Sequence, residues 1–269
     1  MTVEDSLIRY FPGFKNKEIA RKVKIKHLLS HTSGLPDNRN TAADSVFFLT
    51  AKDAENWYPV TQTDSLLFEP GSRFAYSNPA YNGLALIVEQ VSGMKWQQFI
   101  AERIFKRSGM VTSTITDGPH PQEGVAHGYS WINNRWTEDD YGEEPTFPAA
   151  GNGGVWSSVK ELVLYERALT TASFLKRATI DWSRMPLAPD NWSDTTSAKV
   201  GGSWFIGKTP DGLRMVGHTG SQGGFLCNYQ IVPEKQTQVI ILCNAPRDLA
   251  GMTSTVFAML SKANWLDPH

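Results

Sequence analysis

The chain of 269 residues has almost no net charge, only two cysteines and no long apolar segment. Its 26 basic and 27 acidic side chains give a formal net charge of −1, which provides no broad attraction for polyanions and argues against nucleic acid as a partner. No apolar run reaches the length of a membrane-spanning helix, so no membrane span is expected. With 41% hydrophobic and 20% charged residues, the composition predicts an ordinary globular protein and argues against a disordered chain.

Two cysteines, Cys227 and Cys243, are too few for a disulfide framework or a zinc set. They lie in apolar runs on either side of residues 234–236, and pairing Pro233 with Thr237 would make them direct cross-strand neighbours. Directly opposed strand positions fit disulfide torsions poorly. We therefore expect two packed thiols, and we predict neither a metal nor another cofactor.

Two other patterns lack an essential part of the site that they suggest. His27 and His31 would share one face of a helix that stops at Gly34, but the glutamate of a zinc protease motif is absent between them. Both are predicted to be structural. The glycines of residues 151–154 are not followed by the Gly-Lys-Ser/Thr of a phosphate-binding loop, so they predict no nucleotide site.

Helical patterns dominate the chain up to about residue 190. Asn78 is expected to cap a helix that has Pro79 at its first position and ends at Gly93. A second helix is expected to begin near Trp96 and to close near Gly109. The segment before Asn78 is therefore predicted to be a loop braced by a pair of helices.

Later in the chain, Ser158 and Glu161 form a capping-box pattern that predicts another helix. The last third changes to alternating apolar patterns, which predict antiparallel strands over 203–206, 213–219, 225–232 and 238–243. A final helix over about 249–263 can cover one face of this sheet. We interpret residues 1–269 as one α/β domain with a mainly helical and irregular lobe, about 1–190, beside the antiparallel sheet and C-terminal helix of about 200–269.

Tyr76-Ser77-Asn78 and, 142 residues later, His218-Thr219-Gly220 are the motifs able to serve acyl transfer. Transfer through a serine needs a nucleophile, a base, oxyanion donors and a group that binds the substrate carboxylate. Tyr76 is the candidate base or proton relay, although a phenol with a pKa near ~10 needs a neighbouring cation to work at neutral pH. Asn78 is the candidate donor to a substrate carbonyl, and Thr219 is the candidate carboxylate ligand.

These motifs occur in a fixed order with His31-Thr32-Ser33-Gly34-Leu35 before them and Gly153-Gly154 between them. In that order they resemble the class C β-lactamase, D-Ala-D-Ala carboxypeptidase and esterase family of penicillin-recognising serine hydrolases. The resemblance covers nearly the whole chain and implies a β-lactamase-like fold with the active cleft between sheet and helical lobe. It implies an acyl-enzyme reaction on a D-amino-acid peptide, β-lactam or small ester that carries a carboxylate or acyl group.

The resemblance also implies catalytic and binding roles for residues 218–221 on the late strand. The backbone N–H of Ser221, directly after His218-Thr219-Gly220, corresponds to one oxyanion donor. His218 replaces the commoner lysine of that triplet, and a histidine attracts a carboxylate strongly only when protonated, so binding should weaken above roughly pH 6.5.

The element that the resemblance places first, a Ser-x-x-Lys helix, is missing before Tyr76. Two later strings, Ser157 to Lys160 and Ser173 to Lys176, follow the tyrosine loop and are interpreted as structural, as is Ser33. Because residues 3–12 resemble the stretch after the nucleophile helix, we expect an N-terminally incomplete and inactive chain that is poorly soluble or needs a complementing segment.

The sequence leaves open why the Ser-x-x-Lys element is missing, whether the protein is an enzyme, and in which compartment it acts. The gap can reflect a late start codon, a fragment or a degenerate protein. The alternative to an enzyme is a non-catalytic carboxylate- or peptide-binding remnant of the fold. The compartment is also open, since the first residues carry no secretion signal while relatives are often exported.

Overall fold

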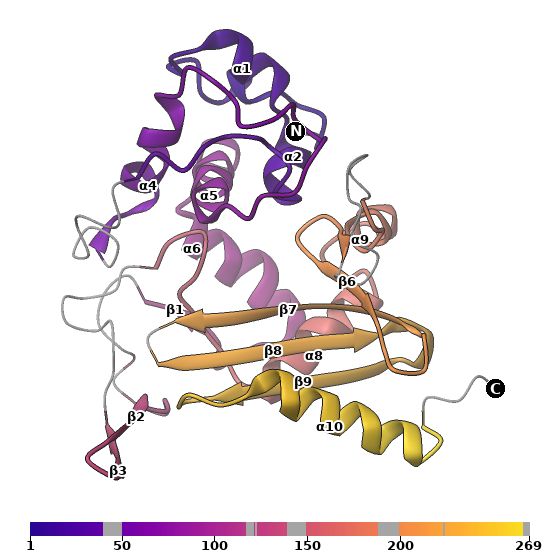
Figure 1. Cartoon of the computed structure of the whole chain (residues 1–269). Coiled ribbons are helices and arrows are strands. Elements are labelled where there is room, and N and C mark those ends of the chain that lie inside the picture. The colour runs from indigo at the N-terminus through magenta and orange to yellow at the C-terminus, as the bar shows by residue number, and fades with distance from the viewer. Residues whose placement is uncertain are drawn as a thin grey trace.

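A helical lobe and an antiparallel sheet lie side by side and make up most of the chain (Figure 1). The computed structural model describes residues 1–39, 50–116, 121, 123–138, 149–187, 199–222 and 224–265. The predicted α/β architecture is confirmed. None of the helices in these ranges has the length and apolar character needed to cross a bilayer.

The helical lobe comes from the first part of the chain. Its helices are α1 (Lys17–Lys22), α2 (Ile25–Leu29), α4 (Asp53–Thr61), α5 (Asn78–Ser92), α6 (Trp96–Ile100) and α7 (Lys106–Ser108), preceded by a 3-10 turn at Leu7–Arg9. Leu7, Phe14 and Leu28 are fully buried in one core with Trp57 and Ile87. The stretch before α1 is thus part of the core of the lobe.

Helix α5 begins one residue away from the predicted cap. Ser77 is the N-cap, because its backbone is extended and its Oγ accepts a hydrogen bond from Ala80 N at 3.3 Å. Asn78 is already helical and Pro79 follows it, so the prediction that Asn78 caps the helix was wrong by one residue. The predicted end at Gly93 is confirmed by its left-handed conformation, φ 69°.

The helix predicted from Trp96 to Gly109 is present but not uniform. Residues Ala101–Phe105 form a π-helical turn between α6 and α7, which the apolar pattern did not predict. Gly109 ends α7 with φ 73°, as expected of a C-terminal glycine.

The sheet has the strand order β5-β6-β7-β8-β9, with every neighbour antiparallel. Its strands are β5 (Lys199–Val200), β6 (Phe205–Lys208), β7 (Arg214–Gln222), β8 (Phe225–Val232) and β9 (Thr237–Cys243). Strand β7 is paired with β6 over its first part only, from Arg214 to Gly217, and Gly217 lies opposite Phe205. In the described ranges, β7 from His218 to Gln222 therefore has no strand on its β6 side.

Helices cover both faces of this sheet (Figure 1). The predicted final helix is confirmed as α10 (Leu249–Lys262), which packs Phe257 against Val232 and Val239. Helix α8 (Val159–Thr170) contacts β9 from the other side, and α9 (Arg177–Ser183) follows it. The smaller pieces are β1 (Thr114–Ile115) paired with β4 (Val155–Trp156), and the hairpin of β2 (Tyr129–Ile132) and β3 (Arg135–Glu138).

The two cysteines are not directly opposed, so that prediction was wrong by one residue. Cys227 lies opposite Leu242, and Cys243 lies opposite Leu226. The connection between β8 and β9 has four residues, ending with Gln236 at φ 48°, and this shifts the register by one. Side chains alternate between faces along a strand, so the two sulfurs point to opposite faces of the sheet. Both thiols are free.

His27 and His31 do not share a helix face, and Gly34 is not the helix stop. Helix α2 ends at Leu29, and His31 lies beyond it with a left-handed φ of 54°. His27 Nδ1 accepts a hydrogen bond from Lys24 N at 3.1 Å, which is the structural role predicted for it. Among the described residues, no group of three metal-ligating side chains comes together.

The capping box at α8 is half formed. Ser158 Oγ accepts from Glu161 N at 3.3 Å, so the predicted N-cap is confirmed. The Glu161 carboxylate does not return to the cap residue but accepts hydrogen bonds from Thr112 N and Ser113 Oγ. Tertiary partners have thus replaced the local one.

Candidate active site

Tyr76 and His218 face each other where the helical lobe meets the sheet. Tyr76 lies in the loop before α5 and His218 lies on β7, and their ring centroids are 6.4 Å apart at 49°. The Tyr76 side chain is about half exposed, at 52%. Two motifs separated by 142 residues of sequence are thus brought to one place.

Aromatic contacts hold the two lobes together around this pair. His218 packs on Phe205 at 5.1 Å, and Phe205 makes an edge contact with Phe74 at 6.2 Å. Ser203 N also donates a hydrogen bond to Leu29 O at 2.9 Å, from the segment before β6 to the end of α2. The position of β7 relative to the tyrosine loop is therefore fixed by contacts on the helical side.

The ring of His218 is oriented by its own neighbour. Its Nδ1 lies 2.5 Å from Thr219 O, and because a carbonyl oxygen only accepts, Nδ1 carries the proton in this contact. The second nitrogen, Nε2, is left for other partners.

Tyr76 has no activating group among the residues that the structure describes. Its hydroxyl makes no hydrogen bond to them, and burial raises the pKa of the phenol above its ordinary value of 10. No positive side chain contributes to this pKa. At neutral pH the phenol is consequently a proton donor rather than a base.

A histidine that the sequence did not single out for the site lies beneath Tyr76. His31 is buried, and its ring stacks on the Tyr76 ring with centroids 4.2 Å apart at 26°. Burial lowers the pKa of His31 to about 4, with the charge of His218 as the second cause. The ring is therefore neutral at pH 7. Only its place in the run from His31 to Leu35 ahead of the tyrosine loop could have indicated it.

Asn78 is half-buried at the first turn of α5, two residues after Tyr76. Its side chain makes no hydrogen bond to the described part of the chain, so its amide keeps both hydrogen-bonding functions. Because Ser77 is the N-cap, the Asn78 side chain is not needed to cap the start of the helix.

Thr219, Gly220 and Ser221 lie on the part of β7 that lacks a β6 partner. Thr219 and Ser221 are exposed. Gly220 lies opposite Cys227, and a Cβ atom at position 220 would be 2.9 Å from Cys227 Sγ. Because Gly220 has no side chain, the Cys227 side chain of β8 can lie against the backbone of β7 at this position.

Gly220→Ala is expected to destabilise the fold by about 1–3 kcal/mol, because the new methyl group overpacks against Cys227. Adding Cys227→Ala should recover most of that loss, since it removes the atom in conflict. Urea unfolding of the two single variants and the double variant measures the coupling. Simple additivity of the two changes would show that the close approach is not the cause.

The three serines weighed as internal nucleophiles have other partners. Ser157 Oγ lies 2.8 Å from Ser113 Oγ, and Ser173 Oγ lies 2.7 Å from Thr171 Oγ1. Ser33 is buried and its Oγ accepts from Leu35 N at 3.3 Å. Within the described ranges, none of them makes a hydrogen bond with Tyr76.

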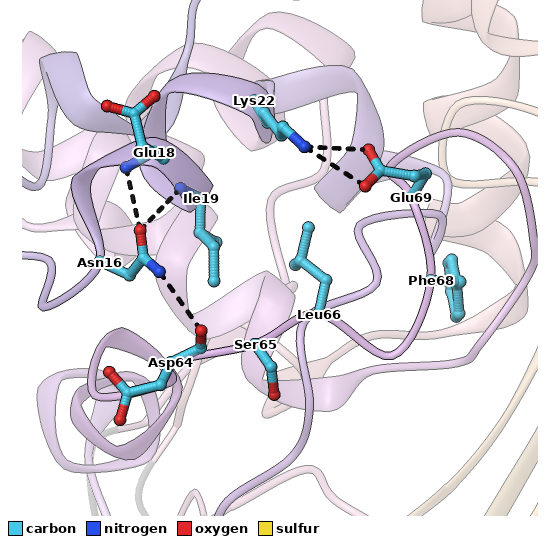
Figure 2. A pocket seen from close by; sticks show the side chains of 9 residues that line it. All are labelled: Asn16, Glu18, Ile19, Lys22, Asp64, Ser65, Leu66, Phe68 and Glu69. Atoms are coloured by element: carbon cyan, nitrogen blue, oxygen red, sulfur yellow. Dashed lines mark hydrogen bonds and ion pairs between the residues drawn. The ribbon is translucent and has the colours of Figure 1, made fainter.

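A separate cavity of about 490 Å³ lies on the helical lobe, between α1 and residues 64–69 (Figure 2). Helix α1 is at the end of the lobe farthest from the sheet (Figure 1). Lys22 Nζ lies 3.3 Å from a Glu69 oxygen at its rim, and Asn16 Nδ2 donates to Asp64 O. No predicted site residue lines this cavity, so the candidate site remains at Tyr76 and His218.

Comparison with known proteins assigns the family. The family model described as Beta-lactamase matches residues 1–262, so the chain belongs to the β-lactamase family. It is 28% identical over 258 residues to a penicillin-binding protein from Bacillus subtilis (strain 168), covering 91% of this chain and 55% of that protein. It is 26% identical over 280 residues to a D-aminopeptidase from Brucella anthropi, covering 97% of this chain and 48% of the relative.

Solved structures show the same fold. The octameric penicillin-binding protein homologue from Pyrococcus abyssi superposes with a TM-score of 0.80 at 23% identity, covering 99% of this chain and 60% of that one. The D-amino acid amidase from Ochrobactrum anthropi SV3, complexed with L-phenylalanine amide, gives a TM-score of 0.77 at 20% identity, over 98% of this chain and 77% of that one. The chain spans about half the length of the curated relatives that it matches.

Proposed function

We propose that this chain forms the tyrosine and His-Thr-Gly parts of a serine hydrolase site that acts through an acyl-enzyme on an amide, β-lactam or ester. The observation that carries the proposal is the pairing of Tyr76 with His218 across the two lobes, at 6.4 Å between ring centroids. The relative named as a D-aminopeptidase and the fold neighbour named as a D-amino acid amidase support a D-amino-acid peptide or amide as the substrate class.

In this proposal a serine oxygen attacks the substrate carbonyl carbon, and its proton passes by way of Tyr76 to the departing amine or alcohol. Water then hydrolyses the acyl-serine ester. Asn78 donates its amide to the substrate, while His218 and Thr219 hold the substrate carboxylate. Gly220 links Thr219 to Ser221 in the substrate-binding segment of β7, and the backbone N–H of Ser221 is one oxyanion donor.

The serine and its lysine come, in this proposal, from sequence outside these 269 residues. The support is chemical: within the described residues Tyr76 has no cation beside it, and burial raises the pKa of its phenol. A tyrosine in that state cannot deprotonate a serine at neutral pH. The 269 residues alone are thus proposed to lack turnover and to need a complementing segment.

Labelling with a fluorescent penicillin or a fluorophosphonate tests this directly. We expect no stoichiometric label on the 269-residue polypeptide, because it supplies no activated serine. Stoichiometric labelling of that polypeptide would refute the proposal. In-frame codons upstream of Met1 that encode Ser-x-x-Lys, and labelling of the chain extended by them, would support it.

In such an extended chain, Tyr76→Phe is expected to slow acylation by about 10²–10⁴-fold, because the proton relay is lost. Tyr58→Phe is the matched control, since Tyr58 is exposed on α4 and lies outside the proposed site. Single-turnover acylation rates measure both. An equal loss in the two variants would remove Tyr76 from the proposed mechanism.

The second candidate function is a non-catalytic module that binds a carboxylate ligand such as a short peptide. Among the described residues, the Tyr76 hydroxyl has no hydrogen-bond partner, and burial raises the pKa of its phenol. Both observations favour this candidate. Saturable binding of an acyl-D-Ala-D-Ala peptide without turnover, from a gene with no upstream serine and lysine codons, would decide for it.

A further inference from the structure

We propose that His31 is a positioning residue that holds Tyr76 in place opposite His218. The purpose of this arrangement rests on the proposed function, since it is Tyr76 that would transfer the proton. His31 itself is buried, and we assign it no contact with the substrate.

His31 binds the backbone on both sides of Tyr76. Its carbonyl oxygen accepts a hydrogen bond from Ala75 N at 2.8 Å, and its ring Nδ1 accepts one from Ser77 N at 3.0 Å. These two bonds fix the residues before and after the tyrosine. One residue therefore determines the direction in which the Tyr76 side chain leaves the loop.

The ring of His31 is also the surface on which Tyr76 rests. The two rings stack at 4.2 Å and 26°, and His31 stacks on Tyr81 at 5.1 Å and 29°. Tyr81 is itself tied down, because its hydroxyl donates to Leu29 O at 3.0 Å. The stack thus connects Tyr76 to the end of α2 and to α5.

The backbone of His31 is in an uncommon conformation. Its φ of 54° is left-handed, a conformation that few residues other than glycine adopt and that surrounding contacts must hold. His27, the other buried histidine of this segment, does not have a positive φ. The conformation lets the carbonyl and the ring of His31 reach Ala75 and Ser77 together.

The bond from Ser77 requires Nδ1 of His31 to be unprotonated. Burial supports this, since it lowers the pKa of His31 to about 4, and the nearby charge of His218 acts in the same direction. The titratable groups around the ring are Tyr76, Tyr81 and His218, and both tyrosines are neutral at pH 7. A neutral acceptor ring is therefore the form that holds the loop.

Nuclear magnetic resonance of the unmodified protein gives the first test. At pH 7 we expect the ¹⁵N shift of an unprotonated Nδ1 in His31 and a scalar coupling across the hydrogen bond from the Ser77 amide. A protonated Nδ1 with no coupling would overturn the proposal. This measurement does not depend on any variant folding.

Two substitutions then separate the acceptor from the stacking surface. His31→Asn keeps an oxygen acceptor on a residue that tolerates left-handed φ but removes the ring, so the Tyr76 ring resonances should lose their ring-current shift. His31→Phe keeps a ring without an acceptor, so the Ser77 amide should move instead. His27→Asn is the matched control, because it also alters a buried histidine.

A wild-type position of the Tyr76 resonances in folded His31→Asn protein would overturn the proposal. So would an equal displacement in His27→Asn protein, because that would indicate general loosening. In an extended chain with the serine and lysine, His31→Asn should lower acylation by about 10²-fold through misplacement of Tyr76. If the unmodified extended chain does not acylate, the proposed function fails, while the resonance tests still decide the role of His31.

Discussion

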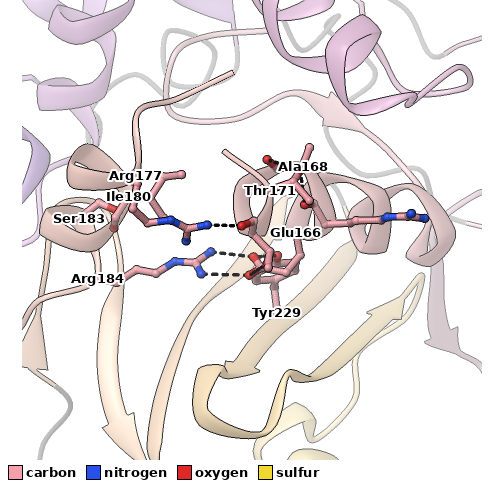
Figure 3. Close-up of polar contacts among 10 residues, drawn as sticks. Glu166, Ala168, Thr171, Arg177, Ile180, Ser183, Arg184 and Tyr229 are labelled. Carbon is pink, nitrogen blue, oxygen red and sulfur yellow. Dashed lines mark hydrogen bonds and ion pairs between the residues drawn. The ribbon is translucent and has the colours of Figure 1, made fainter. Parts of the chain in front are cut away.

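Arg184→Met is expected to destabilise the protein by about 3–5 kcal/mol, because it leaves a buried carboxylate without its cation. Arg184 Nη1 and Nη2 donate to the two oxygens of Glu166 at 3.0 and 2.7 Å (Figure 3). Glu166 is 3% exposed and Arg184 is 9% exposed. Removal of one partner of a buried ion pair costs far more stability than removal of one partner of an exposed pair.

This ion pair connects three elements. Glu166 belongs to α8 and Arg184 follows the end of α9, while the Tyr229 hydroxyl on β8 donates to Glu166 at 2.9 Å. Burial and the charge of Glu166 raise the pKa of Tyr229, so the phenol keeps its proton and remains a donor. Loss of Arg184 therefore loosens the attachment of α8 and α9 to the sheet.

Urea unfolding at pH 7 measures the effect through the midpoint and slope. The triple change Glu166→Leu, Arg184→Met and Tyr229→Phe should recover most of the loss, because it replaces the whole buried polar group by apolar side chains.

Arg21→Met is the matched control, since Arg21 pairs with Glu18 on the surface, and it should cost about 0–1 kcal/mol. A similar small cost for Arg184→Met would mean that water reaches Glu166 in solution.

Local signals predicted the regular elements well. The strands β7 to β9, the helix α10 and the ends at Gly93 and Gly109 follow from alternation, apolar periodicity and glycine. Features that depend on a turn or on a distant partner were missed. The left-handed Gln236 shifts the cysteine register, and Glu166 meets Tyr229 across 63 residues without any local pattern.

For the candidate site, the sequence indicated the two motifs but not what supports them. Tyr76 and His218 could be predicted as a pair because of their order along the chain, and in the structure their rings lie 6.4 Å apart at 49°. His31 could be predicted only as a buried structural histidine. Its role depends on a left-handed backbone and a stack of rings from separate segments, and neither is encoded in residue spacing.

Stability is expected to fall as the pH is lowered from about 6.5 to 4, by about 3 kcal/mol for each of His27 and His31. Burial lowers the pKa of both residues from 6.5 to about 4. Between these values the unfolded chain binds a proton at each site and the folded protein does not. Stability is therefore fully present above pH 6.5 and is lost toward pH 4.

Neighbouring charges modify but do not reverse this expectation. Lys26 and Lys24 lower the pKa of His27 further and Glu4 raises it. Asp53 acts in the opposite sense, because burial raises its pKa, so its own contribution favours the folded state as the pH falls. The carboxyl of Glu4, whose pKa is lowered from 4.5 to about 2, loses its contribution between these values and so mostly below the histidine range.

Urea unfolding at several pH values between 7 and 4.5 gives the proton uptake from the slope of stability against pH. The slope should correspond to the uptake of nearly two protons on unfolding of the unmodified protein. In His27→Gln or His31→Asn protein it should correspond to about one proton. Repetition at high salt is the control, because burial is insensitive to screening while surface charge is not. A slope that disappears in salt would assign the lowered pKa values to the neighbouring charges, Lys24 and Lys26 at His27 and His218 at His31, and not to burial. An unchanged slope in both variants would mean that His27 and His31 are not the groups that make the fold acid-sensitive.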